Sequence, residues 1–151
     1  MAKKRYYLAY GSNLNVRQMR YRCPGAAVVG TTELKGYSLR FRGSKSGNYL
    51  TVEKEKGGTV PVAVWAVSEE NLKHLDMYEG YPTFYRREKM KISLDGQTLE
   101  AIIYIMNDVG TYGWPSKSYM ITCLEGYQNF RFKSRYLYEA LEKTKELKDN
   151  G

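Results

Sequence analysis

Short segments in which apolar and polar residues alternate recur along this chain of 151 residues, and they constrain its fold more than any other feature. Tyr37–Arg42 alternates strictly and Met90–Leu94 repeats the pattern, which is typical of strands with one buried face. The turn signal Asp95-Gly96 predicts a hairpin from Met90–Leu94 into Leu99–Met106. Aromatic and apolar residues at Arg5–Tyr10 predict a first strand. The chain is therefore expected to build an antiparallel sheet.

Glycine and proline divide the middle of the chain into further strands. Gly57-Gly58 is a strong turn signal, so we expect a hairpin that pairs Tyr49–Glu53 with Thr59–Val67. Pro61 has no N–H for a sheet ladder, which predicts that its strand starts at an edge or contains a bulge. Ala26–Leu34 is expected to be another strand.

Helices are expected between and after these strands. Ser68 is a favourable N-cap, acidic residues follow it in the first turn, and Gly80 is typical of the position past a helix end. The expected helices are Leu14–Cys23, Ser68 to Gly80, Lys117–Tyr127 and Ser134–Leu147, with a linker at Tyr81–Glu88 and a loop that contains Gly110, Gly113 and Pro115. The elements predict one α+β domain, residues 1–151, in which helices flank a small antiparallel or mixed, barrel-like sheet.

The composition indicates a globular protein of the cytoplasm. Hydrophobic residues make up 42%, and no apolar run reaches the ~20 residues of a membrane-spanning helix. The basic N-terminal residues lack the apolar segment of a secretion signal. Cys23 and Cys123 fit a reducing compartment, and neither they nor the lone His74 have metal-ligand spacing, so we expect no metal. The sequence does not indicate an oligomeric state.

Charge and tyrosine content bear on the partner. There are 24 basic and 16 acidic residues, but the basic residues are scattered and form no long block, which disfavours a dedicated nucleic-acid binder. The 15 tyrosines exceed expectation. Tyrosine has a rigid apolar body and one hydroxyl, so it suits the wall of a small-molecule pocket as well as a core.

Glu79 occupies an unusual position on its expected helix. At 100° per residue it falls on the same stripe as Leu72 and Leu75, although burying a charge costs several kcal/mol unless it is paired. One interpretation is that Glu79 meets water at the helix end or pairs with Arg86 or Arg87. The other is a carboxylate in a pocket, whose pKa desolvation raises toward the ~6–7 that suits proton exchange at neutral pH.

A sharp turn, Gly11-Ser12-Asn13, separates the first strand from the first helix. Gly11 presents no side chain and allows unusual backbone angles, and N–H groups at a helix start can hold a carboxylate or carbonyl oxygen. An ordinary strand-to-helix turn with an asparagine cap predicts the same residues. Ser12 as a nucleophile is disfavoured, because His74 falls on the helix surface and no other histidine can serve as its base.

Three stretches in this order carry a family resemblance. They are "YGSNL" at Tyr10–Leu14, "LDMYEGYP" around Asp76 to Gly80, and "PSKSY" at Pro115–Tyr119. Across nearly the whole chain they resemble the gamma-glutamylcyclotransferase-like family, which comprises gamma-glutamylcyclotransferases and gamma-glutamylamine cyclotransferases. The resemblance implies a barrel-like sheet with flanking helices and a pocket at the "YGSNL" loop.

The resemblance also implies a reaction and a set of site residues. Such enzymes cleave a γ-glutamyl amide by internal attack, release 5-oxoproline and an amine or amino acid, and use no cofactor. By position, Glu79 matches the catalytic acid/base. The residues that match the substrate-binding loop and the pocket tyrosines are Tyr10, Gly11, Ser12, Asn13 and Leu14, and Tyr85, Tyr104 and Tyr119.

Two other functions stay open at this point. One is a non-catalytic binding module for a small acidic metabolite on the same scaffold, and the other is a nucleic-acid binder that stacks bases on exposed tyrosines. Glu79 favours the enzyme, because a pure anion binder would avoid a negative charge beside its ligand. The sequence leaves the leaving group open among γ-glutamyl amino acids, glutathione, a γ-glutamyl-lysine crosslink and a γ-glutamylated biosynthetic intermediate.

Overall fold

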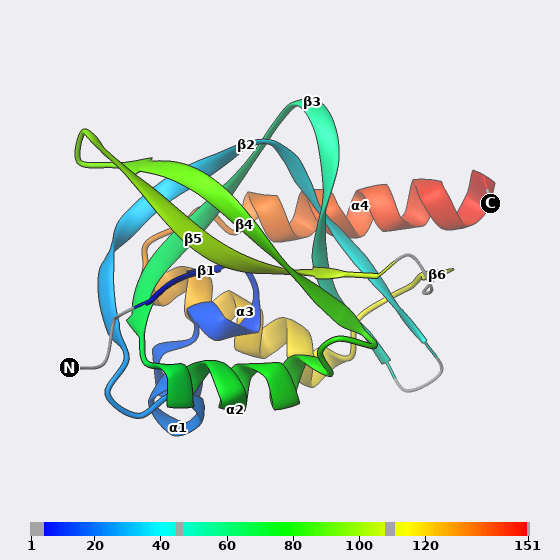
Figure 1. The fold of residues 1–151 in the computed structure, drawn as a ribbon. Coiled ribbons are helices and arrows are strands. Elements are labelled where there is room, and N and C mark those ends of the chain that lie inside the picture. Colours follow the sequence, from blue (N-terminus) through cyan, green and yellow to red (C-terminus); the bar gives the residue numbers. More distant parts are fainter. Residues whose placement is uncertain (1–4, 45–46, 108–110, 151) are drawn as a thin grey trace.

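A curled mixed sheet with flanking helices forms the core of the molecule (Figure 1). The computed structural model describes residues 5–44, 47–107 and 111–150. Its elements are β1 (Arg5–Ala9), η1 (Ser12–Leu14), α1 (Val16–Arg22), β2 (Ala27–Ser44), β3 (Gly47–Val67), α2 (Glu69–Glu79), β4 (Tyr85–Leu94), β5 (Gln97–Met106), β6 (Thr111–Tyr112), α3 (Lys117–Asn129) and α4 (Arg135–Asn150). The expected α+β class with a barrel-like sheet is confirmed.

Strand β1, which has five residues, lies in the middle of the sheet. Within the described residues the strand order is β4-β5-β1-β3-β2-β6. β1 is antiparallel to β3 and parallel to β5, with Tyr7 opposite Ile102, so the sheet is mixed. Tyr7, Leu8 and Ala9 are all buried. The loop that follows Ala9 therefore leaves the sheet from its most central strand, with strands on both sides.

The long hairpin of β2 and β3 contradicts one prediction. The hairpin expected to pair Tyr49–Glu53 with Thr59–Val67 across Gly57-Gly58 is wrong, because both segments belong to β3 and both pair with β2. The expected strands Ala26–Leu34 and Tyr37–Arg42 likewise join, from Ala27 onward, into the single strand β2. Pairing between β2 and β3 continues from Ala27 opposite Ala66 to Ser44 opposite Gly47, with no reversal at Gly57-Gly58.

A bulge explains why the two glycines do not reverse the chain. Tyr37 lies opposite Lys54, but Lys35 lies opposite Thr59, so a stretch of β3 that contains both glycines is looped out of the ladder. A β-carbon on Gly58 would lie only 2.4 Å from the carbonyl oxygen of Tyr37. Gly58 thus allows a close backbone approach, Gly57 has a positive φ of +80°, and the bulge increases the twist that curls the sheet.

Other boundaries differ from the expected ones for local reasons. β4 begins at Tyr85, so only the first half of the expected linker Tyr81–Glu88 lies outside the sheet. The expected helix Leu14–Cys23 is divided into η1 and α1 by Asn15, whose side chain accepts a hydrogen bond from the Gln18 N–H at 3.2 Å. The hairpin at Asp95-Gly96 is confirmed, with both residues at positive φ.

Pro61 lies in a part of β3 that is paired on one side. The residues of β3 that pair with β1 are Ala63 to Val67, and Pro61 precedes them. In the described part of the chain it pairs with Glu33 of β2, consistent with the expected edge position. α3 and α4 lie close to their expected ranges, and α4 packs against β2. Gly110 of the expected loop and the first four residues lie outside the described part. No described helix is both long and apolar enough to cross a membrane.

α2 is built as expected and positions the candidate glutamate. The Ser68 side chain accepts from the Asn71 N–H at 3.0 Å, and the Asn71 side chain accepts from the Ser68 N–H at 3.0 Å, which is a reciprocal cap. Leu72 and Leu75 are buried. The helix ends at Gly80, in the left-handed conformation with φ of +67°. Cap, stripe and end together fix where the last residue of α2 points.

Replacing Ser68 by alanine should lower the free energy of unfolding by about 1 kcal/mol, because the Asn71 N–H loses its acceptor. Urea unfolding followed by circular dichroism measures the change. Ser93→Ala is the matched control, since Ser93 is exposed on β4 and should change stability by less than about 0.5 kcal/mol. Equal losses in the two variants would contradict the role of the cap.

Candidate active site

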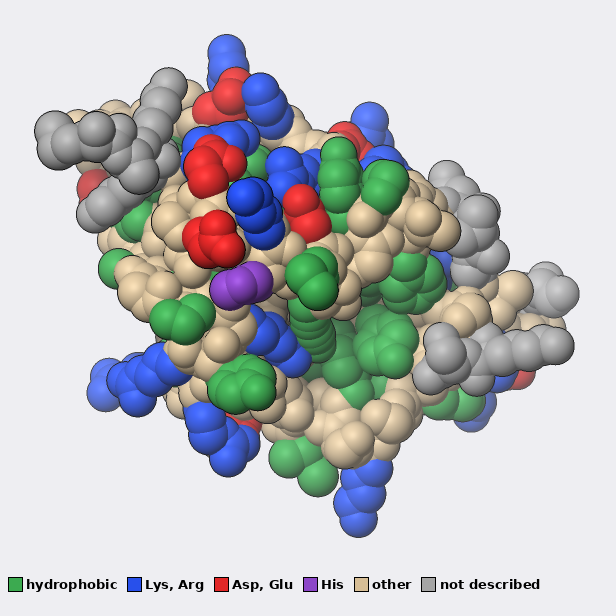
Figure 2. Space-filling view, turned by 60° about the horizontal axis from the view of Figure 1, so that its bottom comes forward, with side chains coloured by type: hydrophobic (Ala, Val, Ile, Leu, Met, Phe, Trp, Pro, Cys, Tyr) green, Lys and Arg blue, Asp and Glu red, His purple; other side chains and the backbone are tan. Residues whose placement is uncertain are grey.

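A cavity of about 300 Å³ opens where β1 ends. It lies between the loop after β1, the end of α2, the strands β3, β4 and β5, and α3. In Figure 2 the α1–α2 end of the molecule faces the viewer, and hydrophobic side chains gather in and around a hollow. The cavity is lined by Tyr7, Tyr10, Gly11, Ser12, Asn13, Tyr49, Leu50, Met77, Tyr78, Glu79, Gly80, Phe84, Tyr85, Tyr104 and Tyr119.

All the site residues expected from the sequence line this cavity except Leu14. Leu14 is fully buried in the core, and its N–H donates to the carbonyl oxygen of Gly11 at 3.0 Å within the turn. Its contribution is therefore to hold the loop against the core. The cavity brings together residues from segments that are far apart in the sequence, which is the arrangement expected of a binding site.

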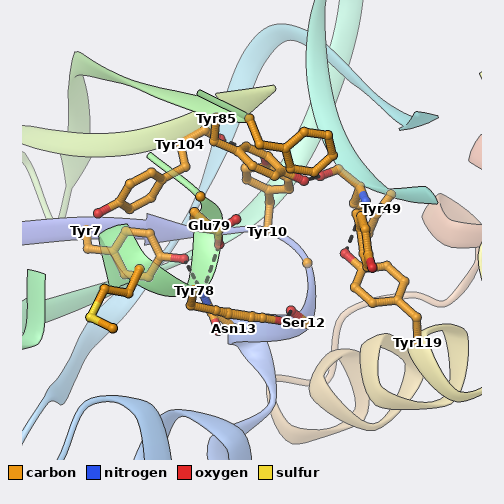
Figure 3. A pocket seen from close by; sticks show the side chains of 15 residues that line it. Tyr7, Tyr10, Ser12, Asn13, Tyr49, Tyr78, Glu79, Tyr85, Tyr104 and Tyr119 are labelled. Carbon is orange, nitrogen blue, oxygen red and sulfur yellow. Dashed lines mark hydrogen bonds between the residues drawn. The ribbon is translucent and has the colours of Figure 1, made fainter. Parts of the chain in front are cut away.

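Glu79 points into the cavity from the end of α2, toward Asn13 on the loop (Figure 3). Asn13 Nδ2 donates to Glu79 Oε1 at 3.3 Å and to the Tyr7 hydroxyl at 2.8 Å. The arginines considered as surface partners are engaged elsewhere: Arg86 binds Glu88 at 2.7 Å, and Arg87 binds Asp76 at 2.9 Å. The interpretation of Glu79 as a surface ion pair with either arginine is therefore wrong.

The surroundings of Glu79 change its acidity. Burial raises the pKa of Glu79 to about 7, and the positive charge of Arg22 acts in the opposite direction. Burial also raises the pKa values of Tyr7, Tyr85 and Tyr119 well above the usual range, so these hydroxyls stay neutral at physiological pH. The cavity thus contains one carboxyl group that titrates near neutrality among hydroxyls that do not.

Backbone contacts fix the tyrosine side chains in place. The Tyr10 hydroxyl donates to the carbonyl oxygen of Tyr104 at 2.7 Å, and the Tyr85 hydroxyl donates to that of Leu50 at 2.7 Å. The Tyr119 hydroxyl accepts from the Leu50 N–H at 3.1 Å. These bonds join the loop after β1 to β5, β4 to β3, and α3 to β3. The walls of the cavity are therefore cross-linked by the side chains that line it.

Gly11 lies between β1 and η1 with φ of −126° and ψ of −127°. This ψ lies outside both the β region and the right-handed α region, which agrees with the unusual backbone angles expected at this turn. An added β-carbon would lie 3.4 Å from the Leu50 side chain and 3.4 Å from the Tyr119 hydroxyl, which is ordinary contact. Glycine here keeps space open in the cavity. The hydrogen bonds of the turn use the N–H groups of Leu14 and Asn15, not those of Ser12 and Asn13.

Ser12 does not have the partners of a nucleophilic serine. Its Oγ lies 3.3 Å from the Tyr78 hydroxyl. The one histidine of the sequence, His74, is exposed on α2, as expected, and its Nδ1 lies 3.1 Å from the carbonyl oxygen of Arg22. Among the described residues, no group of three His, Cys, Asp or Glu side chains is placed to hold a metal ion.

Sequence reasoning missed several residues of the site. One of them is Tyr7, whose hydroxyl accepts a hydrogen bond from Asn13. Another is Asp76, which accepts at 2.6 Å from the hydroxyl of Tyr104, a residue that the sequence did identify. Arg22 donates to Asn13 and lies over the Tyr78 ring, with its guanidinium carbon 3.4 Å from the ring centroid. The other missed residues that line the cavity are Tyr49, Leu50, Met77, Gly80 and Phe84. The only available signal was the excess of tyrosine.

The central strand of a curled sheet, ending in a glycine loop beside a partly buried glutamate, defines a small-molecule enzyme site, and comparisons with known proteins identify its class. Residues 7–121 match the family model described as gamma-glutamyl cyclotransferase, AIG2-like. The chain belongs to this family and is an enzyme of the gamma-glutamylcyclotransferase type.

Individual relatives agree with this assignment. The chain is 29% identical over 133 residues to the human gamma-glutamylcyclotransferase, which covers 82% of this chain and 70% of that protein. A stretch of 54 residues is 44% identical to a protein of Methanocaldococcus jannaschii and covers 35% of this chain and 45% of that protein, less than half of its length. A solved structure of a gamma-glutamyl cyclotransferase superposes with a TM-score of 0.78 at 25% identity, over 97% of this chain and 87% of that chain.

The acidity of Glu79 predicts a pH-dependent stability. Its pKa is about 7 in the folded protein and 4.5 in the usual reference, so the folded state binds this proton more tightly than the unfolded state. The stabilisation that this proton contributes is therefore fully present below pH 4.5 and is lost as the pH rises through about 7. Glu79→Gln should remove that loss and be more stable than the wild type at pH 8, by at most about 3 kcal/mol.

Urea unfolding at a series of pH values measures this difference. Glu70→Gln is the matched control, because Glu70 is exposed on the same helix and should show no comparable gain at pH 8. A Glu79→Gln variant whose stability follows that of the wild type at every pH would show that the carboxylate is not desolvated.

Proposed function

We propose that this enzyme cleaves a γ-glutamyl amide by attack of the substrate's own α-amine on its γ-carbonyl carbon, releasing 5-oxoproline and an amine or amino acid, with Glu79 as general acid/base. The observation that carries the proposal is a carboxyl group of pKa about 7 inside a cavity, directly opposite a loop without a side chain at Gly11. Family membership supports the general reaction.

Proton transfer is the step that needs a catalyst of this acidity. The α-amine of a γ-glutamyl compound, with a reference pKa of ~7.7–8.0, is mostly protonated at neutral pH and then cannot attack. The Glu79 carboxylate takes one proton from the ammonium group, the amine nitrogen bonds to the γ-carbonyl carbon, and the amide C–N bond breaks. The carboxyl group returns the proton to the departing nitrogen. The attacking nitrogen still carries one proton more than the ring amide of 5-oxoproline, and the same carboxylate passes this second proton to the departing amine, which leaves as an ammonium ion. The balance then closes with no added water or cofactor.

The loop after β1 is the proposed holder of the γ-glutamyl group. The N–H groups of Ser12 and Asn13 are not used by the two hydrogen bonds of the turn, and the absent side chain of Gly11 lets a ligand approach the backbone. In this proposal Tyr10 and Leu14 anchor the loop at its two ends. A substrate held here would keep its amine close to its own γ-carbonyl, and such internal attack has a large advantage over a reaction between separate molecules.

The aromatic walls support the same reaction. The neutral hydroxyls of Tyr85 and Tyr119 are fixed by the Leu50 backbone, and the Tyr104 ring packs edge-on against Tyr7 with centroids 5.8 Å apart. We propose that these side chains shape the pocket around the glutamyl chain and exclude water. Exclusion of water preserves the raised pKa of Glu79 on which the proton transfer depends.

A non-catalytic binding module for a small acidic metabolite is the second candidate. The loop alone would suit such a role. The orientation of Glu79 favours the enzyme, because a carboxylate inside the cavity would repel an anionic ligand unless it served to accept a proton. The nature of the leaving group follows from neither the loop nor the glutamate, and a substrate panel decides it.

Glu79→Gln should abolish turnover while the fold is retained, because the amide keeps the shape of the side chain but cannot accept the proton. The purified protein is incubated with γ-glutamyl amino acids, γ-glutamyl amines and glutathione, and 5-oxoproline is measured by chromatography. The wild-type rate should rise with pH through about 7, as Glu79 ionises. Glu70→Gln, on the exposed face of α2, should keep full activity. Wild-type turnover by Glu79→Gln would exclude the mechanism.

Gly11→Val should raise the KM for the γ-glutamyl substrate at least tenfold, because its methyl groups would occupy the cavity beside Leu50 and the Tyr119 hydroxyl. Gly11→Ala is the graded control: its β-carbon would meet only ordinary contacts at 3.4 Å, so the increase should be smaller. Steady-state kinetics on the best substrate of the panel measure both variants. An unchanged KM in Gly11→Val would count against substrate binding at this loop.

A further inference from the structure

Arg22, the last residue of α1, contacts the candidate active site from outside the cavity. Its guanidinium donates a hydrogen bond to Asn13 Oδ1, and Asn13 Nδ2 donates in turn to the Tyr7 hydroxyl at 2.8 Å and to Glu79 Oε1 at 3.3 Å. The same guanidinium lies over the Tyr78 ring, with its carbon 3.4 Å from the ring centroid. Arg22 therefore reaches Glu79 through one intervening side chain.

The chemistry of these groups fixes the orientation of the Asn13 amide. A guanidinium has donors and no acceptor, so it can bind only the amide oxygen, and the amide NH2 must then face Tyr7 and Glu79. If the amide rotated by half a turn, its oxygen would face the carboxyl group and favour the protonated form. We propose that Arg22 is a positioning residue that holds the Asn13 NH2 group toward Glu79 and whose charge favours the carboxylate form of that residue.

The electrostatic surroundings of Glu79 agree with this role. The groups that face its carboxyl are neutral hydroxyls, those of Tyr7 from β1, Tyr10 from the loop after β1, Tyr78 from α2 and Tyr85 from β4. Among the residues that the structure describes, Arg22 is the one charged group with an appreciable effect on Glu79, and it lowers the Glu79 pKa while burial raises it. The pKa of about 7 is thus a balance between burial and one arginine.

The position of Arg22 is itself fixed by α2. Asn71, His74 and Tyr78 lie at helical spacing on one side of that helix. Asn71 Nδ2 donates to the carbonyl oxygen of Pro24 at 3.2 Å, His74 Nδ1 lies 3.1 Å from the carbonyl oxygen of Arg22, and Tyr78 receives the guanidinium. Since α2 also carries Glu79, the helix that supplies the carboxyl group holds the arginine that tunes it.

The catalytic part of this inference rests on the proposed function, so the test measures the acidity of Glu79 and the activity separately. Arg22→Met removes the charge and the donors but keeps an apolar stem, Arg22→Gln keeps an amide donor without the charge, and Arg22→Lys restores the charge. Arg20→Met, on the exposed side of α1, is the matched control. Circular dichroism confirms that each variant is folded, and Arg22→Gln carries the test should Arg22→Met not fold.

The first readout is the Glu79 carboxyl titration, followed by NMR of protein labelled with ¹³C at glutamate carboxyls and assigned by the signal missing in Glu79→Gln. In Arg22→Met the pKa should rise by about one unit, as expected when a nearby arginine is lost. Arg22→Gln should show a rise too, and Arg22→Lys should return close to the wild type. A Glu79 titration in Arg22→Met and Arg22→Gln equal to that in Arg20→Met would overturn the inference.

The second readout is the pH profile of kcat on the best substrate. A rise of about one unit reduces the ionised fraction of Glu79 at pH 7 from about a half to about a tenth, so kcat should fall about fivefold and recover by pH 9. A kcat that stays reduced at every pH would overturn the charge effect. If Glu79→Gln is active while Arg22→Met still shifts the titration, the proposed function fails and the electrostatic role of Arg22 stands.

Discussion

The contact between the Glu79 carboxylate and the Asn13 amide is the interaction on which the site depends. A carboxylate turned away from water costs several kcal/mol unless donors replace the lost solvent. Here one amide, itself bound to Tyr7 and Arg22, is the donor that the described structure provides. The compensation is incomplete, so the group stays poised between its two protonation states instead of being locked as an anion.

The topology of the sheet brings the two sides of this contact together. Asn13 follows the central strand β1, and Glu79 ends a helix that follows β3, the neighbour of β1. Because β1 lies between β3 and β5, the loop after it has walls on both sides, and Leu50 and Tyr104 contribute to them. The bulge at Gly58 curls the same β3 over the core. Strand order and curvature thus determine where the cavity can form.

The sequence predicted best where one element decides the outcome. Helical spacing with Leu72 and Leu75 was enough to direct Glu79 inward, and the cap at Ser68 was enough to begin α2. Contacts between distant segments, such as Arg22 on the Tyr78 ring, leave no periodic signal and were missed. Gly57-Gly58 was misread because a bulge and a hairpin turn can both contain glycine, and only the register with β2 distinguishes them. The fold class survives such errors, since it depends on alternation more than on boundaries.

The neutral tyrosines explain why a single carboxyl group can serve the proposed reaction. Burial raises the pKa values of Tyr7, Tyr10 and Tyr85, so near neutral pH these hydroxyls neither accept the substrate's proton nor release their own. The remaining exchange is between Glu79, with a pKa of about 7, and an α-amine of ~7.7–8.0. A mismatch of about one unit corresponds to about 1.4 kcal/mol, so the proton can move in either direction at small cost. Such reversibility is what a group needs if it must first take a proton and then return it.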